Sequence, residues 1–199
     1  MHLQHLLFSL LLLSGYYYIG NKIIIFFKIK KIVENISEPF YQNTLIGLVS
    51  FIFIFYPIFF LEVYKYSFFL IISSLIIIFG IINFILNINY FIKFFKKIFF
   101  NFKKNTFLFY IVNFLIFLFF LLSICPITSG DSVSYHMGVA KFILENGKFP
   151  EDLFYPEAPL VGAGEFLNTF ALSVKAYQFT SLINFVGLIS IIGILKKFA

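Results

Sequence analysis

The residues able to do chemistry gather in one stretch of the chain. Six of the nine acidic residues lie between Asp131 and Glu165, and Tyr135 and His136 follow Asp131 closely. A carboxylate at the outer mouth of a membrane helix can act as a general base or hold a metal ion. The same Asp can also simply cap the next helix, which is worth about 1 kcal/mol. The residues alone leave both interpretations open.

Several other site types lack support in this sequence. The chain contains no HExxH, P-loop or GxSxG motif, so a metalloprotease, an ATPase or an α/β-hydrolase is not indicated. Cys125 is the single cysteine, which excludes an internal disulfide and a cysteine metal cluster. A lone histidine such as His136 is most often a packing or interfacial residue. We therefore predict no metal-ligand set.

A helix is predicted directly after Asp131. Pro126 ends the preceding apolar stretch, and a helix over 132–146 follows, with Gly147 in the position after its end and Pro150 blocking its continuation. Lys141 lies off the apolar face. The helix is therefore expected to be amphipathic and to lie along the outer membrane interface. The residues expected on its apolar face are Val133, Met137, Ala140 and Leu144.

Long uncharged windows predict the elements that position this stretch. The chain is 61% hydrophobic and 12% charged, with 33 Phe and a mean hydropathy of +0.97. A soluble domain has about 25% charged residues, and a helix needs roughly 20 apolar residues to cross a bilayer. We predict an all-α integral membrane protein with about five transmembrane helices, in which the Phe residues face lipid or fill the core. The uncharged windows are 1–21, 39–61, 66–92, 105–130 and 176–195.

Lysine counts in the intervening segments predict the orientation of these helices. Segments 22–38, 62–65, 93–104, 131–175 and the C-terminal tail carry 4, 1, 5, 3 and 2 lysines. By the positive-inside rule, the N-terminus and the 131–175 loop are outside and the C-terminus is cytoplasmic. The net charge of +6 sits beside apolar segments, which indicates the lipid bilayer as partner and no nucleic acid.

The stretch from about Ile124 to Leu195 resembles the start of a GT-C glycosyltransferase, the group that includes protein mannosyltransferases and the lipid A aminoarabinose transferase. The resemblance rests on Asp-Ser-x-x-Tyr-His, then Asn-Gly-Lys-Phe-Pro, then Gly-x-Gly-Glu, in that order after an apolar helix and a proline. It is greatest for bacterial members. The matching residues are Asp131, Ser132, Tyr135, His136, Asn146, Gly147, Lys148, Phe149, Pro150, Gly162, Gly164 and Glu165.

The resemblance implies transfer of a sugar from a polyprenyl-phosphate donor to an acceptor on the periplasmic side of a bacterial inner membrane. It implies that Asp131 is catalytic and activates the acceptor hydroxyl directly or with a divalent metal ion. Tyr135 and His136 are then the expected substrate-binding residues. Two features depart from the family: many members carry a second acid where Ser132 stands, and members commonly run far beyond the length at which this chain ends.

These observations predict two parts of the chain. Residues 1–104 would hold the first three helices with their basic cytoplasmic segments, and residues 105–199 the GT-C-like start with helix four, the outer loop 126–175 and helix five. The early end predicts a fragment, inactive alone, or a degenerate relative. The alternative is a non-catalytic multi-pass membrane protein: a scaffold, an accessory subunit or a transporter fragment. The absence of Asp, Glu, Lys and Arg inside the uncharged windows disfavours transport.

Overall fold

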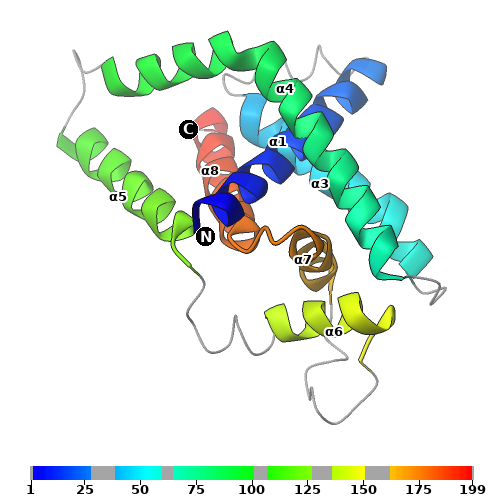
Figure 1. Cartoon of the computed structure of the whole chain (residues 1–199). Helices are drawn as coiled ribbons and strands as arrows, with labels where there is room; N and C mark the ends of the chain where they lie inside the picture. Colours follow the sequence, from blue (N-terminus) through cyan, green and yellow to red (C-terminus); the bar gives the residue numbers. More distant parts are fainter. Residues whose placement is uncertain are drawn as a thin grey trace.

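The described part of the structure is entirely helical, apart from turns. The computed structural model describes residues 2–27, 39–59, 65–100, 107–126, 136–150 and 162–198, and no strand occurs among them. Figure 1 shows the arrangement of these helices. The helices are α1 (His2–Phe26), α3 (Pro39–Phe59), α4 (Tyr66–Phe100), α5 (Phe107–Ile124), α6 (Gly138–Asn146), α7 (Ala163–Ser173) and α8 (Phe179–Phe198).

Each of the five uncharged windows forms a helix, which confirms the all-α prediction for the described residues. The helices in question are α1, α3, α4, α5 and α8. Two apolar stretches, Leu3–Phe26 and Tyr66–Ile88, have the length and composition needed to cross a membrane. Three shorter apolar stretches lie in the other helices: Gln42–Pro57, Tyr110–Ile124 and Phe179–Ile192.

The longest helix, α4, changes direction before it ends. Its 35 residues would span about 50 Å if straight, well beyond a hydrocarbon core of about 30 Å. Figure 1 shows the first part of α4 rising beside α3 and its last part running across the end of the molecule opposite α6 and α7. The helix therefore continues past residue 92, where the uncharged window ends.

Glycines let α1 pack unusually close to α3 and α4. A Cβ atom on Gly20 would lie 1.8 Å from the carbonyl oxygen of Asn43, and one on Gly15 would lie 2.1 Å from that of Ile76. No side chain fits at such distances, so these backbones are in direct contact, as in membrane helix pairs with small interfacial residues. The glycines that face a neighbouring backbone in this way are Gly15, Gly20, Gly47 and Gly80.

An aromatic core lies where α7 meets α3 and α4. Phe170 of α7 is completely buried, and its ring centroid lies 4.9 Å from that of Phe51, 5.1 Å from that of Phe69 and 5.0 Å from that of Phe166. All three pairs are close to perpendicular, the arrangement in which ring edges meet ring faces. Short α7 is therefore at the centre of the packing.

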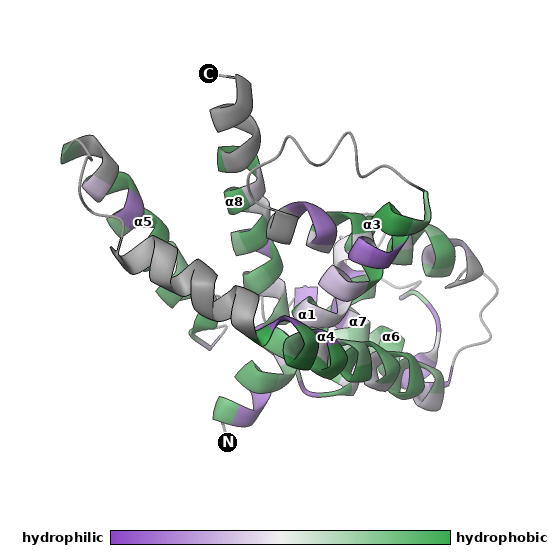
Figure 2. Cartoon of the chain, turned by 90° about the horizontal axis from the view of Figure 1, so that it is seen from above, coloured by the Kyte–Doolittle hydropathy of each residue, from purple (hydrophilic) through white to green (hydrophobic). Residues whose placement is uncertain are grey.

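The outer surface, by contrast, is largely apolar. Helix α5 has its main contacts with α8, and Figure 2 shows it standing apart as a mostly hydrophobic helix. Phe107 and Leu122 on α5 are 81% and 66% exposed, and Leu86 on α4 is 68% exposed. Exposed apolar side chains in this number need a lipid or protein cover.

Replacing Gly20 by alanine tests the close helix contact. The added methyl group has no space against the Asn43 carbonyl, so α1 and α3 must separate, and we expect a loss of about 1–3 kcal/mol in unfolding free energy. Thermal unfolding in detergent measures this as a lower midpoint. Gly187→Ala on α8 is the matched control, because no heavy atom lies within 4 Å of its new methyl group. That control should be neutral or stabilising by about 0.5–1 kcal/mol. Equal midpoints for the two variants would contradict the contact.

Candidate functional site

Helix α6 ends as the sequence predicts. Gly147 has a φ of 70°, and its N–H donates to the carbonyl of Ile143 at 2.8 Å, so glycine supplies the left-handed residue that closes the helix. The described part of this region begins at His136. Asp131 and Tyr135, the predicted catalytic residue and one of the two predicted substrate-binding residues, lie outside the described residues. Their assignments stay predictions.

The apolar face of α6 is covered by protein. Val139, Ala140 and Ile143 are completely buried, and the face packs mainly on α7. Lys141 and Glu145 are exposed on the other side and form an ion pair at 3.8 Å. Of the predicted apolar face, Ala140 and Leu144 are buried, Met137 is half-buried and Val133 lies outside the described residues, while Val139 and Ile143 join the buried face. This face contacts α7 rather than lying open for the membrane interface. Helix α7 was not predicted from the sequence, so no protein surface was expected there.

Helix α7 is the element that the sequence analysis did not predict. It spans 11 residues, eight of which are buried, and it follows Gly162. Glu165 is the third residue of the helix, and its Oε2 accepts a hydrogen bond from the Gly162 N–H at 2.9 Å. This is the carboxylate half of a capping box. Glu165 three residues after Gly162, followed by apolar Phe166 and Phe170, was the available signal.

Glu165 also contacts the predicted substrate-binding residue His136. Its Oε1 lies 2.6 Å from His136 Nδ1, although the two residues are 29 positions apart. The Glu165 side chain is 8% exposed and that of His136 is 40% exposed. When the carboxylate is ionised, Nδ1–H donates and the contact is a charge-assisted hydrogen bond. A carboxylate in this position fixes the orientation of an imidazole, which is how histidines are aligned for proton transfer or ligand binding.

Hydrogen bonds attach α7 to the beginnings of two other helices. Ser73 near the start of α4 donates to the Phe170 carbonyl at 2.8 Å, and the Tyr66 hydroxyl donates to the Ser173 carbonyl at 3.2 Å. At the C-terminal end of α7, the Lys175 carbonyl lies 2.8 Å from Nδ1 of His5 on α1. The first turns of α1 and α4 therefore lie at the same end of the molecule as α7.

The described residues do not form a metal-binding set. No group of three or more His, Cys, Asp or Glu side chains comes together within the described ranges. Both oxygens of Glu165 already bind within the protein, one to His136 and one to Gly162. The described pair is thus an oriented histidine rather than an open chelate.

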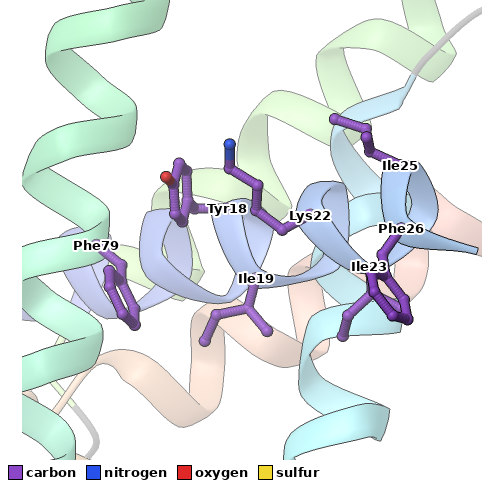
Figure 3. Close-up of a pocket in the computed structure, with 7 residues that line it drawn as sticks. All are labelled: Tyr18, Ile19, Lys22, Ile23, Ile25, Phe26 and Phe79. Atoms are coloured by element: carbon purple, nitrogen blue, oxygen red, sulfur yellow. The ribbon is translucent and has the colours of Figure 1, made fainter.

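A shallow hollow lies elsewhere on the molecule and has a different character. Its volume is about 580 Å³, and Figure 3 shows Lys22 and Tyr18, two of its lining residues, side by side on α1. The Lys22 ammonium lies 5.1 Å from the centroid of the Tyr18 ring. No acidic residue lines the hollow, so it offers no acid–base pair. The lining residues are Tyr18, Ile19, Lys22, Ile23, Ile25, Phe26 and Phe79.

Cysteine labelling tests the position of α6. In a Cys125→Ser background, which removes the exposed native thiol, we expect Lys141→Cys and Glu145→Cys to react rapidly with a membrane-impermeant maleimide. Val139→Cys and Ala140→Cys should stay protected, because both positions are fully buried. Mass spectrometry of intact protein measures the extent of reaction. Similar rates at all four positions would rule out the packing of α6 on α7.

Comparison with known proteins places the chain in a family. A family model described as the DUF1420 N-terminal domain matches residues 86–199, which is more than half of the chain and includes α5, α6, α7 and α8. No curated protein and no solved structure gives a significant match. The matched residues contain both His136 and Glu165. The chain therefore belongs to the DUF1420 family, whose N-terminal domain it carries.

Proposed function

We propose that this chain is the N-terminal part of a GT-C-type glycosyltransferase of a bacterial inner membrane. It uses a polyprenyl-phosphate-linked sugar as donor and transfers the sugar to an acceptor on the periplasmic side. The observation that carries the proposal is the contact between His136 and Glu165. His136 and Glu165 belong to two separate parts of the motif that resembles the GT-C outer loop. In the structure these two parts meet, and the buried carboxylate holds the imidazole.

A five-span topology forms part of the proposal, and the positions of the helix ends support it. An outside N-terminus puts the start of α1, the end of α3 and the starts of α4 and α8 on the outer side. Tyr56, near the end of α3, packs its ring 5.5 Å from that of Phe166 on α7. His5 and Tyr66 also contact the end of α7. Figure 1 shows the last part of α4 and the C-terminus at the opposite end.

The chemistry needs a base close to the oriented histidine. Asp131 precedes His136 by five residues, so a fully extended chain places the two at most about 18 Å apart. The Asp131 carboxylate takes the proton of the acceptor hydroxyl as its oxygen attacks the anomeric carbon. The bond between that carbon and the phosphate oxygen breaks, and the polyprenyl phosphate leaves with the electron pair. Tyr135 and His136 hold the donor phosphate.

Reporter fusions test the topology. We expect alkaline phosphatase fused after Lys148 to be active, because the segment that follows α6 is outside, and green fluorescent protein fused after Lys104 to fluoresce in the cytoplasm. Immunoblots of both fusions control for expression. A well-expressed but silent phosphatase fusion at Lys148 would reverse the topology and remove the periplasmic site.

The substitution Asp131→Asn separates a catalytic role from a capping role. Asparagine caps a helix about as well as aspartate but takes no proton, so transfer from a polyprenyl-phosphate sugar should fall by about 10²- to 10⁴-fold at nearly unchanged thermal stability. The assay uses the complete gene product, with Glu145→Gln on the exposed face of α6 as control. Wild-type activity in Asp131→Asn would overturn the catalytic assignment. Absence of transfer by the wild type would favour the non-catalytic membrane protein.

A further inference from the structure

We propose that Glu165 is a positioning residue that acts through His136. Its carboxylate keeps a hydrogen on Nδ1 of the imidazole, and Nε2 is then the ring atom with which His136 binds the phosphate of the lipid-linked donor. This inference rests on the proposed function and gives that site a further residue. It also specifies the chemistry of binding, namely a hydrogen bond from Nε2–H of the oriented, doubly protonated ring to a phosphate oxygen.

The geometry of the carboxylate sets the protonation of the ring. Oε2 of Glu165 accepts from the Gly162 N–H at 2.9 Å, and Oε1 lies 2.6 Å from His136 Nδ1. An ionised carboxylate has no hydrogen to donate, so in that state Nδ1 must bring the hydrogen to the contact with Oε1. Protonation of the ring keeps this bond and adds an Nε2–H, which can donate to an anionic phosphate.

Glu165 is a firm support for the ring because eight of the 11 residues of its helix are buried. Phe166 and Phe170 on the same helix are at most 1% exposed, and Thr169 donates to the Glu165 carbonyl at 2.9 Å. His136 precedes α6 directly and its side chain is five times as exposed as that of Glu165, at 40% against 8%. The buried partner therefore determines the position of the exposed one. The cost of burying a carboxylate is offset by its two hydrogen bonds.

Glutamine and alanine remove different parts of this arrangement. Glutamine has one acceptor oxygen and one donor NH₂ group. It can accept from Gly162 or from His136 Nδ1–H, but it cannot accept from both as the carboxylate does through its two oxygens. Alanine removes both interactions. Glu145→Gln changes a carboxylate on the exposed face of α6 and serves as the matched control.

The ring form is measured first. In full-length protein with ¹⁵N-labelled histidine, the His136 nitrogen shifts should report a protonated Nδ1 in the wild type and in Glu145→Gln. Glu165→Gln should shift the ring toward the Nε2–H form, and thermal unfolding of each variant checks the fold. The chain has three histidines, so His136→Asn assigns the signals. Unchanged nitrogen shifts in Glu165→Gln would overturn the proposal, whether or not the protein transfers sugar.

Kinetics then separate positioning from a structural role. We expect Glu165→Ala and His136→Asn each to raise the KM for the polyprenyl-phosphate sugar on the order of tenfold, the loss of one charged hydrogen bond. The double variant should be no worse than His136→Asn alone, because Glu165 acts through that ring. Multiplied effects in the double variant would overturn the inference. A wild type without transfer activity would overturn the proposed function and the phosphate role, while the nitrogen shifts still decide whether Glu165 sets the ring form.

Discussion

The described structure depends on the burial of α7. The backbone N–H and C=O groups at the ends of a short, largely buried helix need hydrogen-bond partners within the protein. Its first turn is closed by Glu165, whose carboxylate accepts from the Gly162 N–H. Its last turn is closed by Lys175, which has a φ of 60°. The Lys175 N–H donates to the Leu172 carbonyl at 2.9 Å, and the Ala176 N–H donates to the Ala171 carbonyl at 2.8 Å. This is the Schellman pattern, formed here with a lysine in the left-handed conformation that glycine usually supplies. These hydrogen bonds pair backbone groups at both ends of α7 that the helix itself leaves without partners.

Enclosure of α7 connects the core to the candidate site. The perpendicular ring contacts of Phe170 with α3 and α4 determine how α7 is rotated and how far it is inserted. Glu165 lies five residues earlier on the same rigid helix, so these contacts also determine where its carboxylate meets His136. The glycine contacts of α1 affect the site indirectly. They hold α3 and α4 close to α1, and α3 and α4 in turn pack against α7. A substitution at Gly20 is thus expected to affect the site through the packing of these helices, although Gly20 does not contact the site directly.

The parts of this structure that sequence could predict are those with a local cause. Windows without charge predicted helices at α1, α3, α4, α5 and α8, and Gly147 predicted the end of α6. Helix α7 was not predicted because its 11 residues are too few for a membrane window and because they fall in the stretch assigned to the outer loop 126–175. The partner that makes burial of this carboxylate tolerable, His136, is 29 residues away in the chain. Such a pairing arises only from the fold. The apolar face of α6 was assigned to the membrane interface for the same reason, since its true cover was the helix that had not been predicted.

The two ends of the predicted catalytic segment are held by different forces. At one end, His136 is tied to the protein core through Glu165. At the other end, α5 has its main contacts with α8 alone and exposes much of its apolar surface, including Leu122 near its last turn. In the proposed enzyme, lipid covers that surface. The depth of α5 is then set by the bilayer, whereas the position of His136 is set by the protein core. Asp131 lies in the chain between these two supports. The proposed donor would have the same division, with its polyprenyl chain in the lipid and its sugar phosphate against the protein.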